Sequence, residues 1–244
     1  MTVILIHQKW SIEMNIEKTV CRKIVFSKIR EVLCKNYRNK HAISFLLSKG
    51  ITMEAIMIAM ERQFLAFMPT GKAGAEGWLE KHLGQTLLHK AGLAKPGRSS
   101  MIASRQIAFV FEKGECAEFM SVMPGVKSVR YGDPAKAIVW KGDPKLGALI
   151  VDGMMELLIA VSNGFKGDII VKPTQGFFNR SWLYHYAKAQ RGGTGVIVAL
   201  ADDKKLRNHN HYFAASLAKE TINRAKRSAA VQIPGPFEEA TLLR

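Results

Sequence analysis

The sequence predicts an α+β protein, with an N-terminal helical domain followed by a C-terminal α/β domain that holds a small mixed or parallel sheet. In residues 1–90, apolar residues recur at helical spacings of three and four. From residue 105 onward, short apolar runs typical of strands alternate with helical patterns. Residues 91–104 are rich in Gly, Pro, Ser and basic residues, which is typical of a linker. We therefore predict domains at 1–90 and 105–230, a linker at 91–104 and an irregular tail at 231–244.

The first predicted helix begins near Ile16 and carries a basic outer face. The short run Thr2–Ile6 precedes it and is expected to form a short strand or a buried lead-in. The apolar residues that recur at helical spacing, and that we expect to face the core, are Ile16, Val20, Ile24, Val32 and Leu33.

Three more helices are predicted in the N-terminal half. One covers His41–Ser48 and stops at Lys49-Gly50, where glycine can take the left-handed conformation. The next is capped by Thr52 and runs through Phe67, before Pro69. The last covers Ala75–Lys90.

The turn between the second and third helices invites a comparison with a helix-turn-helix motif. The recognition helix would be Met53–Met68, whose exposed positions include Glu54 and Glu61. Carboxylates fit poorly against phosphates, so a plain helical hairpin is the favoured interpretation.

The C-terminal half alternates strands and helices, which predicts a parallel or mixed sheet. Asp143-Pro144 has the residues of a helix start, and Asn163-Gly164 those of a helix end. The strands are expected at 107–111, 126–131, 137–140, 168–172 and 195–200, and the helices at 143–163, 177–190 and 212–227.

The charge balance points to a polyanionic partner. Lys and Arg number 36 against 20 Asp and Glu, a formal net charge of +16. Two stretches hold many basic and few acidic residues, which favours nucleic acid, DNA first, bound mainly through backbone phosphates. The predicted binding residues are Lys18, Arg22, Lys23, Lys28, Arg30, Lys35, Arg38, Lys40, Lys204, Lys205, Arg207, Arg224, Lys226 and Arg227.

Other classes of protein are disfavoured. No apolar stretch is long enough to cross a bilayer and no signal-peptide pattern is present, so we expect a cytoplasmic protein without membrane insertion. Cys21, Cys34 and Cys116 lack the spacing of a zinc site or a disulfide framework.

Residues 129–203 resemble the large polyvalent protein-associated domain found in plasmid mobilisation relaxases. The resemblance rests on Ala137–Trp140, Gly164–Val171, Phe177–Trp182 and Tyr186–Ala189, followed by the strand in 192–200. It departs from the family where Ala201–Lys205 replaces a Gly-Tyr-x-Pro turn. The resemblance implies a setting in plasmid or mobile-element DNA transfer, and it implies no catalytic residue.

No catalytic or metal site is predicted, and no cofactor. His209 and His211, beside Tyr212, lack the third histidine of a relaxase metal site. The glycine-rich segment Arg191–Gly195 follows a helix and opens a strand, which is the reverse of a phosphate-binding loop. The charges of Glu156, Asp168 and Lys172 do not have the spacing of a metal-dependent nuclease and are interpreted as solvated.

One edge of the predicted sheet remains a candidate ligand site, because ligands of open α/β sheets collect beyond the carboxyl ends of parallel strands. The polar residues expected there are Lys172, Thr174, Asn179, Arg180, Asp202 and Asp203.

The leading hypothesis is a non-enzymatic nucleic-acid-binding accessory protein of a plasmid or mobile element, acting in DNA mobilisation, maintenance or regulation. One alternative is a nucleic-acid-processing enzyme with its site at the carboxyl edge of the C-terminal sheet. Another is an interaction module of a conjugation or replication complex.

Overall fold

The computed structural model describes residues 2–36, 38–96, 98–134, 136–143, 146 and 148–171, together with strands at 195–199, 229–233 and 241–242. The chain forms two compact units, residues 1–133 and 134–244. The α+β class is confirmed. The division between the units falls about thirty residues after the predicted linker. Each unit has its own sheet.

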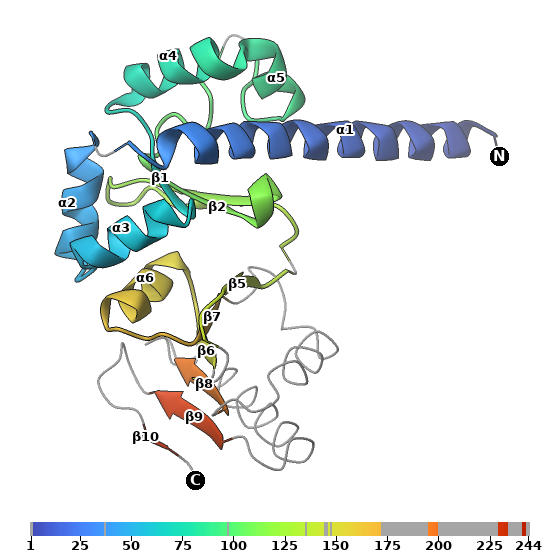
Figure 1. The fold of residues 1–244 in the computed structure, drawn as a ribbon. Helices are drawn as coiled ribbons and strands as arrows, with labels where there is room; N and C mark the ends of the chain where they lie inside the picture. Colours follow the sequence, from blue (N-terminus) through green and yellow to red (C-terminus); the bar gives the residue numbers. More distant parts are fainter. Residues whose placement is uncertain are drawn as a thin grey trace. The chain divides into compact units, whose positions relative to one another are not determined.

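The first unit is built on a four-stranded antiparallel sheet in the order β1-β2-β3-β4 (Figure 1). Its strands are β1 (Leu65–Phe67), β2 (Ile107–Phe111), β3 (Cys116–Met120) and β4 (Val129–Tyr131). Strand β1 lies inside the predicted third helix. That helix, α3, ends at Glu61, and Gln63 takes a φ of 53° before the chain turns into the sheet. Strand β3 was not predicted.

The helices of the first unit follow the predicted order. They are α1 (Thr2–Leu33), α2 (Lys40–Ser48), α3 (Met53–Glu61), α4 (Lys72–Leu83) and α5 (Gln85–Lys90). The predicted Thr52 cap is confirmed, since its side chain accepts a hydrogen bond from the Ala55 amide, and Gly50 has a φ of +80°. The predicted strand or lead-in at Thr2–Ile6 is wrong, because α1 already includes it. The predicted helix at Ala75–Lys90 is divided at Gly84.

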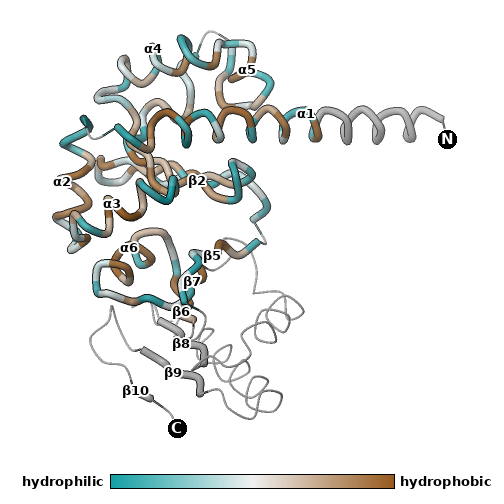
Figure 2. The backbone as a smooth tube through the Cα atoms, in the orientation of Figure 1, coloured by the Kyte–Doolittle hydropathy of each residue, from teal (hydrophilic) through white to brown (hydrophobic). Residues whose placement is uncertain are grey.

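The face of α1 that packs on the core differs from the predicted one. Val25, Phe26 and Ile29 are fully buried in a cluster with residues of β2, β3, α4 and α5. Ile16 and Val20 are instead 59% and 52% exposed. The sequence of α1 carries two apolar stripes, and only packing decides which of them is covered. Apolar and hydrophilic residues therefore alternate along the described part of this helix (Figure 2).

The predicted linker at 91–104 is part of the packed core of the first unit. Ala91, Leu93 and Ile102 are fully buried. The Leu93 carbonyl accepts hydrogen bonds from the Met101 amide at 2.9 Å and from the Ser100 hydroxyl at 3.0 Å. Its small and polar residues thus form a tight turn that closes over α1 and α5.

An aromatic cluster joins α1 to the sheet. The rings of Phe26, Phe119 and Tyr131 lie with centroids 5.6 to 6.0 Å apart. The Arg22 guanidinium lies 4.9 Å from the centre of the Tyr131 ring, and its Nε donates to the Ala91 carbonyl at 2.9 Å. Burial raises the pKa of Tyr131 above its ordinary value near 10, against the opposing effect of the Arg105 and Arg22 charges.

We expect Tyr131→Phe to stabilise the protein by about 1 kcal/mol at neutral pH. The Tyr131 hydroxyl is buried without a hydrogen-bond partner among the residues that the structure describes, so its removal ends a desolvation cost. Because the pKa of Tyr131 is raised in the folded state, ionisation of the phenol disfavours folding. This effect is absent below about pH 10, and stability is lost as the pH rises through the folded-state pKa. Urea unfolding at about pH 7 and about pH 11 should show a smaller alkaline loss in the variant. A variant that is less stable at pH 7 would contradict this account.

The second unit contains a six-stranded mixed sheet in the order β10-β9-β8-β6-β7-β5, as its fold class predicted. Strands β6, β7, β8 and β9 form parallel pairs, while β5 and β10 pair antiparallel at the edges. The strands are β5 (Ile138–Trp140), β6 (Ala148–Val151), β7 (Asp168–Val171), β8 (Gly195–Ala199), β9 (Ala229–Ile233) and β10 (Thr241–Leu242).

Two predictions for the second unit are wrong. The helix predicted at 143–163 is a strand followed by a shorter helix, α6 (Met154–Ser162). The residues of β6 are all buried, as expected for a strand covered on both faces, and their apolar run mimics a buried helix. The tail at 231–244 is not irregular, since it contains β10 and most of β9. The helices predicted at 177–190 and 212–227 lie outside the described residues.

Candidate active site at the carboxyl edge of the second sheet

The strand order of the second unit creates a switch point beside β6. From β6 the chain crosses through α6 to β7 on one side, while β8 lies on the other side of β6 (Figure 1). In open α/β sheets, ligands bind beyond the carboxyl ends of the strands at such a point. The carboxyl end of β6 is Val151, so Asp152 and the start of α6 stand at this position.

Two acidic residues lie at the turn between β6 and α6. Asp152 follows the last residue of β6, and Glu156 lies in the first turn of α6. A Cβ atom added to Gly153 would lie 3.0 Å from Oε2 of Glu156. The Glu156 carboxylate therefore lies beside Gly153, the residue that follows Asp152 in the chain. Glycine at position 153 leaves the room that this carboxylate occupies.

The donor chemistry of this edge fits a divalent cation such as Mg²⁺ or Mn²⁺, which prefers carboxylate oxygens. Asp152 and Glu156 are the residues that would hold it. Within the described part of the chain, no group of three or more His, Cys, Asp or Glu side chains forms a complete metal site.

The predicted ligand edge lies at the carboxyl ends of β7 and β8. Strand β7 ends at Val171 and β8 at Ala199, both parallel to β6, so the chain leaves both strands at the edge that holds Asp152. The predicted residues themselves, namely Lys172, Thr174, Asn179, Arg180, Asp202 and Asp203, lie outside the described residues.

Asp152 was missed by the sequence analysis, and Glu156 was interpreted as a solvated charge in mid-helix. Asp152 was overlooked, and Glu156 was placed in mid-helix instead of in the first turn of α6, because a single helix was predicted across 143–163. A usable signal was present: the apolar run Ala148–Val151 followed directly by Asp152-Gly153. A short apolar run before an Asp-Gly pair is typical of a buried strand that ends in a turn.

Asp168 belongs to the opposite edge of the sheet and has a structural role. Its side chain is 1% exposed, not solvated as predicted. One carboxylate oxygen accepts from the Gly142 amide at 2.7 Å and the other from Nζ of Lys141 at 3.2 Å. This carboxylate fixes the turn after β5 to the amino end of β7.

The basic residues predicted to form one outer face of α1 differ in their burial and in their partners. Arg22 packs against Tyr131, as described above. Lys23 forms an ion pair with Glu115 at 2.9 Å, and Lys28 with Glu31 at 3.3 Å. Lys35, Arg38 and Lys40 are also exposed and follow one another from the end of α1 to the start of α2. Lys18 and Arg30 are half-buried.

The basic stretch from Lys204 to Arg227 lies outside the described residues, as do His209, His211 and Tyr212. Nucleic-acid binding by either basic stretch therefore stays a prediction. The three cysteines are buried thiols. No helix in the described ranges combines the length and the hydropathy needed to cross a bilayer.

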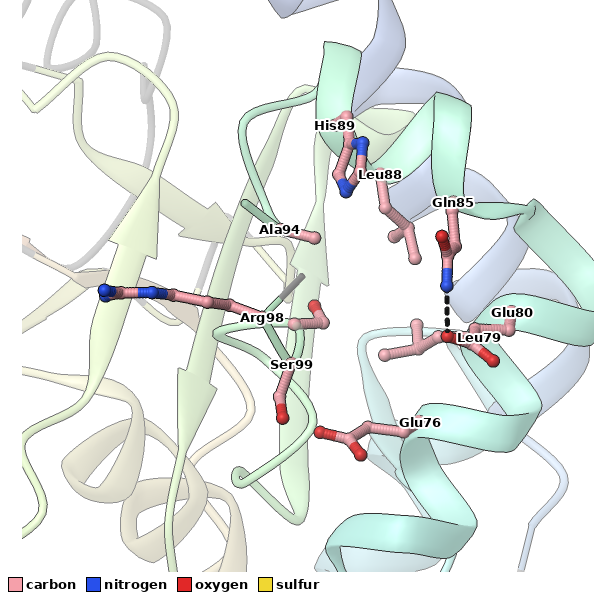
Figure 3. A pocket seen from close by; sticks show the side chains of 10 residues that line it. Glu76, Leu79, Glu80, Gln85, Leu88, His89, Ala94, Arg98 and Ser99 are labelled. Atoms are coloured by element: carbon pink, nitrogen blue, oxygen red, sulfur yellow. Dashed lines mark hydrogen bonds between the residues drawn. The ribbon is translucent and has the colours of Figure 1, made fainter. Parts of the chain in front are cut away.

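The first unit holds a pocket of about 230 Å³ between α4, α5 and the turn at 94–100 (Figure 3). Leu79, Leu88 and Ala94 form its apolar wall, and the carboxylates of Glu76 and Glu80 lie at its polar side. Oε1 of Glu80 accepts a hydrogen bond from the Gln85 side chain at 2.8 Å. The lining is of mixed charge, because it also includes Arg98.

Comparisons with known proteins bear on both units. No protein-family model matches the chain, and no curated protein sequence matches it. Solved structures of primases do. The DnaG primase catalytic domain bound to ssDNA has a TM-score of 0.62 and 13% identity, and the match covers 91% of this chain and 73% of that chain. The chain has the fold of these primase domains.

Two further structures agree. The Aquifex aeolicus primase, comprising zinc-binding and RNA polymerase domains, has a TM-score of 0.59 and 14% identity over 91% of this chain. The RNA polymerase domain of Mycobacterium tuberculosis DnaG primase, in complex with double-stranded DNA, has a TM-score of 0.58 and 13% identity over 90% of this chain. This chain spans 56% of the Aquifex structure and 73% of the Mycobacterium one. The resemblance to a relaxase-associated domain stays a prediction.

Proposed function

We propose that this chain is a nucleic-acid-processing enzyme that transfers nucleotides on a single-stranded DNA template, with its active site at the carboxyl edge of β6. The observation that carries the proposal is the position of Asp152 and Glu156, two acidic residues at the turn from β6 into α6, at the switch point of the sheet. The shared fold supports it, because the match to primase catalytic domains covers about nine tenths of the chain. The proposed function is therefore the processing enzyme, which was the alternative hypothesis, and not the non-enzymatic accessory protein, which was the leading one.

The reaction has simple requirements. A 3′-hydroxyl attacks the α-phosphorus of a nucleoside triphosphate, a new P–O bond forms, and the bond to the pyrophosphate leaving group breaks. A divalent cation, when bound, neutralises charge that develops on the phosphate oxygens. Asp152 and Glu156 are the residues that would supply oxygen donors for it, and the buried strand β6 ends directly before Asp152.

The charge of the chain suits a polyanionic substrate. A net charge of +16 attracts a DNA template, and Lys35, Arg38 and Lys40 are exposed members of the predicted binding set. Such contacts act on the backbone, so they favour binding of a template without regard to its sequence.

The proposal is tested with the full chain, an end-labelled primer annealed to a DNA template, nucleoside triphosphates, and Mg²⁺ or Mn²⁺. A primer is supplied so that the assay does not depend on initiation. Template-dependent lengthening that chelation abolishes would support nucleotide transfer. Shortened primer would indicate hydrolysis and overturn transfer. An unchanged primer, with DNA binding that weakens steeply as salt rises, would overturn the enzymatic proposal in favour of a DNA-binding accessory protein.

A further inference from the structure

Helix α1 carries an apolar stripe on the side that faces away from its own core. Ile16, Val20 and Ile24 follow one another at intervals of four residues and are 59%, 52% and 50% exposed. Nine residues at about 100° each place Val20 about 180° around the helix from the fully buried Ile29. Apolar β-branched side chains in this pattern are typical of a helix face that packs against another helix.

The sequence around this stripe is complementary to itself when two copies run antiparallel. If Val20 of one copy lies opposite Val20 of the other, Ile16 of each faces Ile24 of its partner. The same register sets Glu17 opposite Lys23, so opposite charges meet on both sides of the apolar contact.

The charged residues keep partners within the chain and also remain partly exposed to solvent. Oε1 of Glu17 pairs with Nζ of Lys90 at 2.9 Å, and Lys23 pairs with Glu115. The side chains of Glu17 and Lys23 remain 55% and 50% exposed. A carboxylate has a second oxygen, and an ammonium group has three donors, so each can serve a partner copy as well.

We propose that this face of α1 is a dimerisation surface on which a second copy of the chain docks antiparallel, with Val20 at the two-fold axis. A face that meets its own copy across such an axis must be self-complementary, and the charge pattern about Val20 meets this requirement. The apolar contact is small and the net charge opposes association, so the dimer forms at high protein concentration and is stabilised by added salt.

Disulfide trapping tests the register. Val20→Cys places two thiols together at the axis, so mild oxidation should convert most of this variant to a cross-linked dimer. Ile24→Cys is the matched control, because its position is equally exposed. In the proposed register its two thiols lie eight residues apart along the helix, about 12 Å, which exceeds the reach of a disulfide. The native cysteines are buried, and the unmodified chain gives the background.

A mixing experiment adds the complementary result. Ile16→Cys and Ile24→Cys chains should each cross-link weakly alone and strongly when combined. Light scattering should show the mass of the unmodified chain rising toward a dimer with concentration, while Val20→Glu stays monomeric with an unchanged circular dichroism spectrum. Equal trapping of Val20→Cys and Ile24→Cys, or a monomer at every concentration, would overturn the proposal.

Discussion

Asp152→Asn is expected to reduce metal-dependent extension of a primed DNA template on the order of 10² to 10³-fold. The substitution keeps the shape of the side chain and removes a negative charge from the edge that would hold the cation. Charge stabilisation by such a cation contributes several kcal/mol to the transition state, and each 1.36 kcal/mol corresponds to about tenfold in rate. Glu156→Gln should show a loss in the same range, since its carboxylate lies at the same turn.

The measurement is initial rate of extension at saturating Mg²⁺ and again with Mn²⁺, together with the affinity for single-stranded DNA. The affinity should change by no more than about twofold, because phosphate contacts come from basic residues. Asp143→Asn is the matched control: it removes the same charge from the same unit, in the turn that precedes β6 at the amino edge of the sheet. Equal losses in Asp152→Asn and Asp143→Asn would place the active site elsewhere.

Gly114→Ala is expected to lower the free energy of unfolding of the first unit by about 3 kcal/mol or more. Gly114 lies in the short 3-10 turn Glu112–Gly114 and has a φ of +90°, a conformation that strains a residue with a Cβ atom. The added Cβ would also lie 2.8 Å from the Lys23 carbonyl oxygen and 2.9 Å from the Ser27 amide nitrogen. Both are backbone atoms of α1, so the turn must move away from the helix.

Displacement of this turn would also break the hydrogen bond that the Ser27 hydroxyl donates to the Lys113 carbonyl at 2.8 Å. Gly77→Ala in α4 serves as the control, because nothing lies within 4 Å of its added Cβ and alanine favours a helix. It should leave the first unit unchanged or more stable by up to about 1 kcal/mol. Urea unfolding followed by circular dichroism measures both. Equal stability of the two variants would show that the turn does not pack on α1 as described.

Local chemistry was predicted well from the sequence wherever a short signal decides the structure. The cap at Thr52 and the left-handed Gly50 each depend on a few neighbouring residues, and both are present in the fold. Continuous apolar runs between turns likewise predict the buried strands at 107–111 and 168–171. In these cases the residues that predict a cap, turn or strand are also the residues whose contacts form it.

The candidate site was predicted only in part. The edge beyond β7 and β8 was recognised from the general rule for parallel sheets, and the structure adds β6 between them. Asp152 escaped because Ala148–Val151 has the same apolar run in a strand as in a buried helix. Its assignment depends on pairing with β7 and β8, which are distant in the sequence.

The sequence alone therefore determined the fold class, the mixed sheet of the second unit, the order of the helices and the strong positive charge. Tertiary structure decided which stripe of α1 is buried, because two apolar faces compete and only the surrounding strands and helices select one. It also decided that residues 91–104 pack in a core and that Asp152 and Glu156 lie at the turn between a strand and a helix. Those outcomes come from contacts between segments far apart in the chain, which no local pattern records.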